Sequence, residues 1–248
     1  MTPYPRIFIS AGEHSGDVIG AGLAEEILKR APDARISGLG GSRMARAGVR
    51  LVADTTRHAG MGVLYVLKHL GDWAGVYRRC VAEFNHERPD VVVPIDNPGF
   101  NLGKGGFGGI AGLAADRGAP VCYYVSPQVW AWWSWRIRRI ARMVDRMLTI
   151  LPFEESLYRE RGVDCRYVGH PSFDHLSRHR LDERFVSEMV TGDGPVVGLL
   201  PGSRRQEAAH TFPIIAAAAS RIRREIPETR FHVAAVTREH LPAIREAL

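Results

Sequence analysis

The first turn that could do chemistry follows the strand-like segment 6–10 and precedes a helical pattern that begins at Val18. Besides His14, it carries two glycines and three further polar side chains: Gly12, Glu13, Ser15, Gly16 and Asp17. A glycine-bearing turn exposes backbone N–H groups at the start of a helix, where they favour an anionic or polyhydroxy ligand. Ser15 or Asp17 could equally cap the helix, which is a purely structural role.

A carboxylate, Asp96, stands directly after the continuous apolar run 91–95, which is typical of a strand buried on both faces. In open α/β sheets, ligands bind beyond the carboxyl ends of the strands. Asp96 could therefore act as a general base that takes a proton from a substrate hydroxyl. Its structural alternative is to cap the turn 97–101, which ends in Asn101.

Aromatic side chains gather in the segment 123–133, at the end of another strand-like run. Aromatic faces can stack on sugar rings, while serine and glutamine side chains supply directional hydrogen bonds. Ser126, Gln128 and Trp130 are therefore candidate ligand contacts. Packing of the tryptophans against the basic helix that follows is the competing interpretation.

A fourth turn, 199–207, joins a buried strand-like run to a further helical pattern. Gly202 permits close approach of a ligand to the backbone, the helix N-terminus attracts phosphate, and Arg204 can bind phosphate through two hydrogen bonds. The turn therefore fits a nucleotide diphosphate. Ser203 and Gln206 also form the pattern of a capping box, and the two roles can hold together.

The elements that must position these turns alternate between strands and helices. Strands are expected at 6–10, 35–39, 91–96, 121–126, 147–151, 166–169, 196–200 and 231–236. Apolar residues at helical spacing predict helices over 73–84 and 137–148, and the glycine-rich stretch 103–112 is either a loop or a weak helix. The alternation predicts an α/β fold with Rossmann-type parallel sheets.

A polar, turn-rich region predicts a boundary between a first domain, 1–172, and a second, 195–248, with 173–194 as the linker. Beyond the boundary lie two expected strands and about two helices. A doubly wound domain usually has about five or six strands. The second domain is therefore expected to be incomplete.

Composition narrows the classes of protein to which this chain can belong. With 45% hydrophobic and 24% charged residues, disorder is excluded. The net charge of +6 is concentrated in the segment 135–142, which suits phosphates or forms a solvated helix face, and no nucleic-acid motif accompanies it.

Three widely spaced cysteines suggest neither a disulfide framework nor a zinc site, which favours a reducing cytoplasm. No apolar run approaches the roughly 20 residues that span a bilayer, so any membrane contact is expected to be peripheral.

Ordered blocks along almost the whole chain carry a family resemblance. They are Gly12-Glu13-x-Ser15-Gly16-Asp17, Gly40-Gly41-x-x-Met44, Met61-Gly62, Pro89-Asp90-Val91, Ile95-Asp96-x-Pro98-x-Phe100-Asn101, Tyr124-Val125-Ser126-Pro127-Gln128-Val129-Trp130-Ala131-Trp132, Leu151-Pro152-Phe153-Glu154, Val168-Gly169-His170-Pro171 and Leu199-Leu200-Pro201-Gly202-Ser203-Arg204-x-x-Glu207. In these blocks the sequence resembles lipid-A-disaccharide synthase, a glycosyltransferase of the two-domain GT-B fold.

The resemblance implies inverting transfer of 2,3-diacylglucosamine from its UDP conjugate to 2,3-diacylglucosamine 1-phosphate, which forms a β-1,6 linkage. It places the protein peripherally at the cytoplasmic face of the inner membrane, with no metal or cofactor, no nucleic-acid partner and no predicted oligomeric state. Asp96 would be the catalytic carboxylate. The substrate-binding residues would be Gly12, Glu13, Ser15, Gly16, Asp17, Asn101, Ser126, Gln128, Trp130, Glu154 and His170. The nucleotide-binding residues would be Gly202, Ser203, Arg204 and Glu207.

The sequence departs from the family pattern at His14, Tyr65 and Gly99, and it stops at Leu248, short of the family's length. It is therefore expected to hold the amino-terminal domain and the opening of the nucleotide domain, and could lack activity by itself. Two other functions stay open. One is a non-catalytic module that binds a glycolipid phosphate at a membrane surface through 61–70 and 136–142. The other is a different sugar-nucleotide enzyme of the same fold, such as an epimerase.

Overall fold

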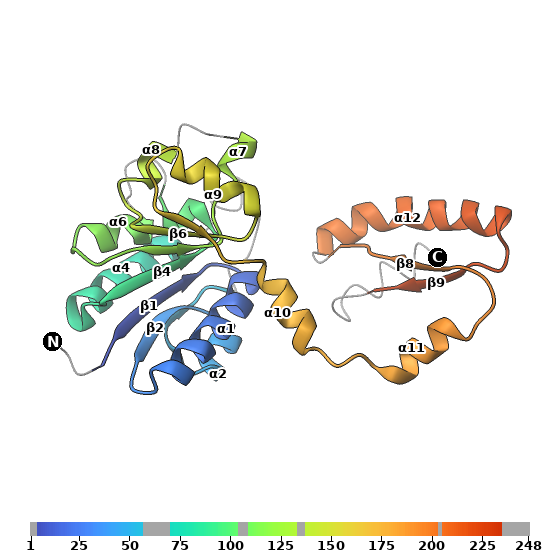
Figure 1. Ribbon diagram of the computed structural model, residues 1–248, viewed down its shortest axis with the longest axis horizontal. Coiled ribbons are helices and arrows are strands. Elements are labelled where there is room, and N and C mark those ends of the chain that lie inside the picture. The colour runs from blue at the N-terminus through green and yellow to red at the C-terminus, as the bar shows by residue number, and fades with distance from the viewer. Residues whose placement is uncertain (1–3, 57–69, 104–108, 133–136, 203–204, 235–248) are drawn as a thin grey trace. The chain divides into compact units, whose positions relative to one another are not determined.

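The computed structural model describes residues 4–56, 70–103, 109–132, 137–202 and 205–234. The chain divides into two compact units, Met1–Arg178 and His179–Leu248 (Figure 1).

The first unit is built on a parallel sheet whose strand order is β3-β2-β1-β4-β5-β6-β7. The strands are β1 (Arg6–Ala11), β2 (Arg35–Gly40), β3 (Arg50–Asp54), β4 (Val91–Ile95), β5 (Cys122–Tyr124), β6 (Arg146–Thr149) and β7 (Cys165–Tyr167). The order reverses between β1 and β4. In doubly wound folds this switch point is where ligands bind, beyond the carboxyl ends of the two strands.

Helices connect the strands of the first unit. They are α1 (His14–Arg30), α2 (Ser42–Arg46), α4 (Leu70–Glu87), α5 (Pro98–Asn101), α6 (Gly109–Ala115), α7 (Val129–Trp132), α8 (Ile137–Ile140), α9 (Pro152–Arg159) and α10 (Pro171–Arg178). Figure 1 shows α1 and α2 against the β1–β2 part of the sheet, away from α4 and α6.

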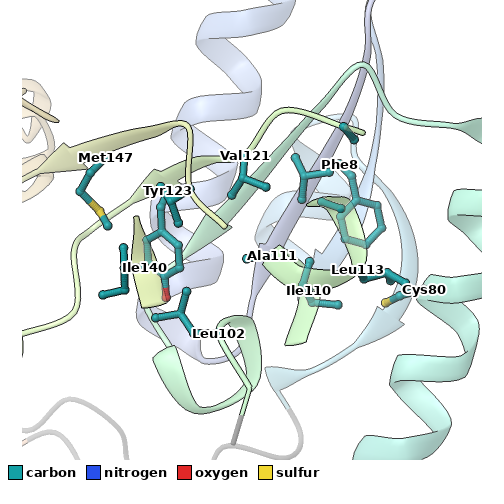
Figure 2. Close-up of a cluster of buried hydrophobic side chains, with 14 of the residues drawn as sticks. Phe8, Cys80, Leu102, Ile110, Ala111, Leu113, Val121, Tyr123, Ile140 and Met147 are labelled. Atoms are coloured by element: carbon teal, nitrogen blue, oxygen red, sulfur yellow. The ribbon is translucent and has the colours of Figure 1, made fainter. Parts of the chain in front are cut away.

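Two apolar clusters fill the two faces of the sheet. Successive residues of a strand point to opposite faces, so Ile7 and Ile9 join a cluster with Met44 and the small residues of α1. Phe8 faces the other cluster, which Figure 2 shows and which holds Phe84 of α4 together with side chains of α6, α8 and α9. Both faces of the central strands are therefore buried, which explains their continuous apolar sequence.

The second unit holds α11 (Glu183–Val190), β8 (Val196–Leu199), α12 (Arg205–Glu225) and β9 (Arg230–Val233). The two strands pair in parallel, and α12 is the crossover between them. A small cluster under α12 contains Phe212 and Ala216, packed against Val233. Within the described residues this unit is one βαβ motif.

The predicted α/β fold is confirmed, and the expected strands are present with slightly shifted ends. Two expectations were wrong or incomplete. β3 was not predicted, because the apolar run of this edge strand, 51–53, is only three residues long. The helix expected over 137–148 ends at Ile140, and Leu148 lies in β6. The expected linker 173–194 contains most of α10 and all of α11. The Asp182 carboxylate caps α11 by accepting the N–H groups of Arg184 and Phe185 in its first turn.

The glycine-rich stretch is helical over α6, and residues 104–108 lie outside the described part. Gly109 has φ +60°, and a Cβ there would approach the carbonyl oxygens of Phe100 and Asn101 to 2.6 Å. This start of α6 therefore requires glycine, because no other residue combines a left-handed backbone with such close approach to α5.

Candidate functional site

The carboxyl ends of β1 and β4 meet at the switch point, where Ala11 pairs with Ile95. Gly12 follows β1, and Asp96 and Asn97 follow β4. A Cβ on Gly12 would overlap the side-chain amide of Asn97. The two turns are therefore in direct contact, and glycine is what allows it.

The backbone of the β4 turn is left-handed at two successive positions. Asp96 has φ +46°, and Asn97 has φ +44°. Residues other than glycine adopt this conformation uncommonly, although asparagine and aspartate tolerate it better than most. Such strained residues cluster at functional sites, where the surrounding structure must hold them in place.

The Asp96 side chain is exposed, so its carboxylate is not directed into the hydrophobic interior. The protein atoms around the carboxylate nevertheless remove part of its solvation and raise its pKa above the ordinary value. The negative charge of Glu13 adds to the rise, and the backbone N–H of Asn97 opposes it. An accessible carboxylate with a raised pKa is suited to accept a proton from a hydroxyl.

Asn101, a predicted substrate contact, is fully buried and uses its amide within the chain. Its oxygen accepts a 2.6 Å hydrogen bond from the Ser10 hydroxyl, and its nitrogen donates to the carbonyl oxygens of Ile95 and Asp96 at 3.3 and 2.8 Å. The side chain thus ties the end of β1 to the end of β4.

Asp17, also a predicted substrate contact, is 2% exposed. Its Oδ1 accepts the N–H groups of Gly41 and Met44 at 2.7 and 3.0 Å, and its Oδ2 accepts that of Arg43 at 3.1 Å. The carboxylate therefore caps α2 from the first turn of α1, whereas the sequence had suggested that it could cap α1 itself.

The other polar members of the first turn differ in exposure. Ser15 is exposed and Glu13 is half-buried, so both reach the surface beside the switch point. Gly16 is buried, and a Cβ there would lie 3.1 Å from that of Ala11. Gly16 therefore allows α1 to approach β1 closely.

The turn after β5 is a second strained segment. Val125 has φ +64°, which is an outlier for a β-branched residue. Ser126 is 4% exposed, and its hydroxyl oxygen has no hydrogen-bond partner among the described residues. The buried Tyr158 hydroxyl donates to the carbonyl oxygen of Pro127 at 2.8 Å, and Gln128 is exposed. An unpaired buried hydroxyl at a strand end is suited to a ligand, because it costs free energy until it finds a partner.

An exposed aromatic pair lies at the ends of β5 and β6. Trp130 and Phe153 are 45% and 51% exposed, and their rings meet edge to face at 5.2 Å. Glu154 is buried. One of its oxygens accepts the Trp130 indole N–H at 3.2 Å, and the other accepts the N–H of Leu151 at 3.3 Å. Glu154 therefore positions Trp130, whose face stays open to solvent.

His170 lies beyond β7, three strands from β4 in the sheet. At the usual spacing of about 4.8 Å between strands, its loop is roughly 14 Å from that of Asp96. Its Nδ1 accepts the N–H of Ser172 at 3.2 Å. The structure therefore brings the turns of Gly12, Asp96 and Asn101 together but leaves His170 at the far edge.

In the second unit, Gly202 lies between β8 and α12 with φ +108°, a conformation that favours glycine. The predicted phosphate contacts Ser203 and Arg204 lie outside the described residues, as does the side chain of Glu207.

Two further features are absent from the ranges described above. There, no group of three or more His, Cys, Asp or Glu side chains is arranged to hold a metal ion. None of the described helices combines the length and apolar character of a bilayer-spanning segment.

The family model described as lipid-A-disaccharide synthetase matches residues 7–248. The chain belongs to this family. It is 40% identical over 227 residues to the lipid-A-disaccharide synthase of Geobacter sulfurreducens, covering 91% of this chain and 58% of that protein. It is also 40% identical over 228 residues to the same-named protein of Myxococcus xanthus, covering 92% of this chain and 58% of that protein. The chain thus spans 58% of the length of these curated relatives.

Among solved structures, this member of the synthetase family is similar to a putative UDP-N-acetylglucosamine 2-epimerase of Listeria monocytogenes. The TM-score is 0.62 at 12% identity, over 99% of this chain and 65% of that one. It is also similar to the glycotransferase of kitacinnamycin, with a TM-score of 0.58 at 13% identity over 94% and 66% of the two chains. At these identities the likeness shows the fold, which is shared by glycosyltransferases and epimerases.

The candidate site includes residues that sequence reasoning missed. The Tyr123 hydroxyl donates to the carbonyl oxygen of Asp96 at 2.6 Å, and the buried Thr55 hydroxyl donates to that of Ala11 at 2.6 Å. Ser10 joins them through Asn101. Ser10 carried a signal, because a hydroxyl interrupts an otherwise apolar strand. Tyr123 resembled an ordinary core residue, and Thr55 gave no signal at all.

Proposed function

We propose that this protein acts in the transfer of a 2,3-diacylglucosamine unit from its UDP conjugate to 2,3-diacylglucosamine 1-phosphate, with Asp96 as the general base. Family membership supports the reaction class. The observation that carries the assignment of Asp96 is its accessible carboxylate, with a raised pKa, on a left-handed turn at the switch point of the sheet.

The proposed step is one inverting displacement. The acceptor's 6-hydroxyl oxygen attacks the anomeric carbon of the donor sugar from the face opposite the diphosphate. Asp96 takes the hydroxyl proton as the new bond forms, and UDP leaves with the electron pair of the broken bond. For this transfer, a carboxylate oxygen must come within about 2.6–3.2 Å of the hydroxyl oxygen. The raised pKa makes Asp96 a stronger base than an ordinary surface aspartate.

The neighbouring side chains have proposed roles in holding the acceptor. Glu13, Ser15 and Gln128 are accessible at the carboxyl edge and can bind sugar hydroxyls. The unpaired Ser126 hydroxyl can donate to the same ligand. The open face of Trp130 can pack against a sugar ring or an acyl chain.

On the second unit, considered by itself, the Gly202 turn at the start of the 21-residue α12 supports a diphosphate site. Helix N-termini stabilise phosphate charge, and Arg204 would add a charged donor. We propose that this turn stabilises the charge that develops on UDP. Both substrates carry acyl chains, so the protein is proposed to work peripherally at the cytoplasmic face of the inner membrane.

The test uses the protein at its full natural length, labelled donor and acceptor in detergent micelles, and two matched variants. Asp96→Asn should lower kcat by roughly 10²–10⁴-fold, the range for loss of a general base, while donor binding measured by calorimetry persists. Asp33→Asn is the control, because Asp33 is an exposed aspartate in the turn before β2, at the opposite end of the sheet.

Three results would contradict the proposal. Retained transfer in Asp96→Asn would remove the base assignment. Donor or acceptor binding without any transfer by the wild-type protein would favour a binding module. A product that is an epimer of the donor sugar would favour an epimerase.

A further inference from the structure

The main-chain carbonyl oxygen of Asp96 receives two side-chain hydrogen bonds. The Tyr123 hydroxyl donates from 2.6 Å, and the Asn101 amide nitrogen donates from 2.8 Å. The two donors come from β5 and α5, and Ser10 at the end of β1 orients the amide of Asn101. Three segments thus converge on one peptide group of the strained turn.

We propose that Tyr123 is a positioning residue, which clamps the Asp96 carbonyl through its hydroxyl and so fixes the direction of the Asp96 carboxylate. The inference rests on the proposed function, in which that carboxylate is the base. The clamp has no expected contact with substrate, because Tyr123 is 0% exposed.

The backbone geometry explains why a clamp is needed. An aspartate in the left-handed region is disfavoured relative to an extended or helical one by about 1–2 kcal/mol, and here Asn97 is left-handed as well. The backbone dihedrals of Asp96 set the direction of its Cα–Cβ bond. Holding its carbonyl therefore holds the Cα–Cβ bond from which the carboxylate extends, whereas a relaxed turn would carry that bond, and the carboxylate with it, elsewhere.

The surroundings of Tyr123 separate the hydroxyl's role from that of the ring. Figure 2 shows Tyr123 within the apolar cluster, together with Leu102 and Ile140. Phenylalanine would fill this space almost as well, so packing alone does not require the hydroxyl. Burial, together with the charge of Asp96, raises the pKa of Tyr123 well above its ordinary value. The hydroxyl therefore stays protonated and can donate throughout the working pH range.

Tyr158 provides a matched control. It is also 0% exposed, and its hydroxyl donates at 2.8 Å to the main-chain carbonyl oxygen of Pro127, in the turn that follows β5. Tyr158→Phe therefore deletes the same kind of buried hydrogen bond in the same unit, but on a different loop. Any effect that Tyr123→Phe has and Tyr158→Phe lacks is specific to the Asp96 turn.

The first experiment needs no enzymatic activity. The pKa of Asp96 is measured by carbon NMR on ¹³C-labelled aspartate in the wild-type chain and in both variants. We expect Tyr123→Phe to lower this pKa toward the ordinary value, because a freed carboxylate gains solvent. Tyr158→Phe should leave it unchanged. Ser10→Ala, which frees the Asn101 amide, should lower the Asp96 pKa by a smaller amount than Tyr123→Phe does. This variant replaces Tyr123→Phe in the test if Tyr123→Phe does not fold.

The second experiment measures kinetics in the full-length protein. Tyr123→Phe should lower kcat by roughly ten- to a hundredfold, the range for a misplaced catalytic group, with KM within twofold of wild type. The acidic limb of its pH–rate profile should move to lower pH.

Two results would overturn the proposed clamp. One is an Asp96 pKa that is the same in the wild type and in Tyr123→Phe, and the other is a pKa shift of equal size in both tyrosine variants. Failure of the base assignment is a different result. In that case Asp96→Asn keeps its activity, while the NMR comparison still decides whether Tyr123 holds the turn.

Discussion

Replacing Asp17 with alanine should destabilise the first unit strongly, because it removes a buried acceptor of three backbone N–H groups. The N–H groups of Gly41 and Met44 are in buried residues, whereas Arg43 is exposed and can turn to water. A buried donor left unpaired costs about 1–3 kcal/mol, so two of them lower the free energy of unfolding by roughly 2–6 kcal/mol. Such a loss is a large part of the total stability of an ordinary domain.

The loss can be measured by urea unfolding followed through tryptophan fluorescence. All five tryptophans lie between residues 73 and 135, so the signal reports on the first unit alone. The matched control is Asp145→Ala, because the exposed Asp145 accepts one backbone N–H, that of Val121, at 2.7 Å. Val121 is 1% exposed, so this variant leaves one buried N–H group unpaired and should lower the free energy of unfolding by about 1–3 kcal/mol, half the loss expected for Asp17→Ala. Equal losses in the two variants would refute the reasoning that the number of buried N–H groups left unpaired sets the magnitude.

Three further predictions concern the same unit and the same assay. Gly12→Ala should lower the free energy of unfolding by about 1–3 kcal/mol, because its Cβ displaces the Asn97 amide, and most of that loss should vanish in an Asn97→Gly background. Phe84→Ala should lower the free energy of unfolding by about 3–5 kcal/mol, because Phe84 is 1% exposed and its ring packs edge to face on that of Phe8, with the ring centroids 4.7 Å apart. A loss below about 1.5 kcal/mol would contradict that packing. The raised pKa of Asp96 means that the folded state holds this proton more tightly, so wild-type stability falls as pH rises from the ordinary aspartate value through the raised one. Asp96→Asn should lack that fall when urea titrations at about pH 3 and about pH 7 are compared, and identical pH dependence in both proteins would count against it.

Much of the fold could be predicted from the sequence, because the central strands are buried on both faces and show continuous apolar runs. The position of Asp96 at the carboxyl end of β4 followed from one such run, Val91–Ile95. The edge strand β3 gives a weaker signal, since its apolar run is three residues long and lies between Arg50 and Asp54. At Leu148 the sequence favoured both a helix, from the spacing over 137–148, and a strand, from the run 147–151, and pairing with β5 and β7 determines the strand.

The candidate site was harder to predict, because its support depends on partners that are distant in sequence. Asp17 looked like a ligand contact or a cap of its own helix, yet its partners lie 24–27 residues away on α2. The Tyr123 hydroxyl finds its acceptor at Asp96, 27 residues earlier, only because β4 and β5 are neighbours. Local patterns identify which residues carry chemistry, but the sheet order decides which residues support them.

The left-handed conformation of Asp96 also determines which replacement gives an interpretable result in mutagenesis. Alanine lacks the short polar side chain that makes this region tolerable, so Asp96→Ala would disturb the main chain and remove the carboxylate at once. A conventional alanine scan would combine these two effects in one number and overstate the importance of the charge. Asparagine keeps the conformational tolerance and the size of the side chain, which makes Asp96→Asn the substitution that isolates the acid–base chemistry.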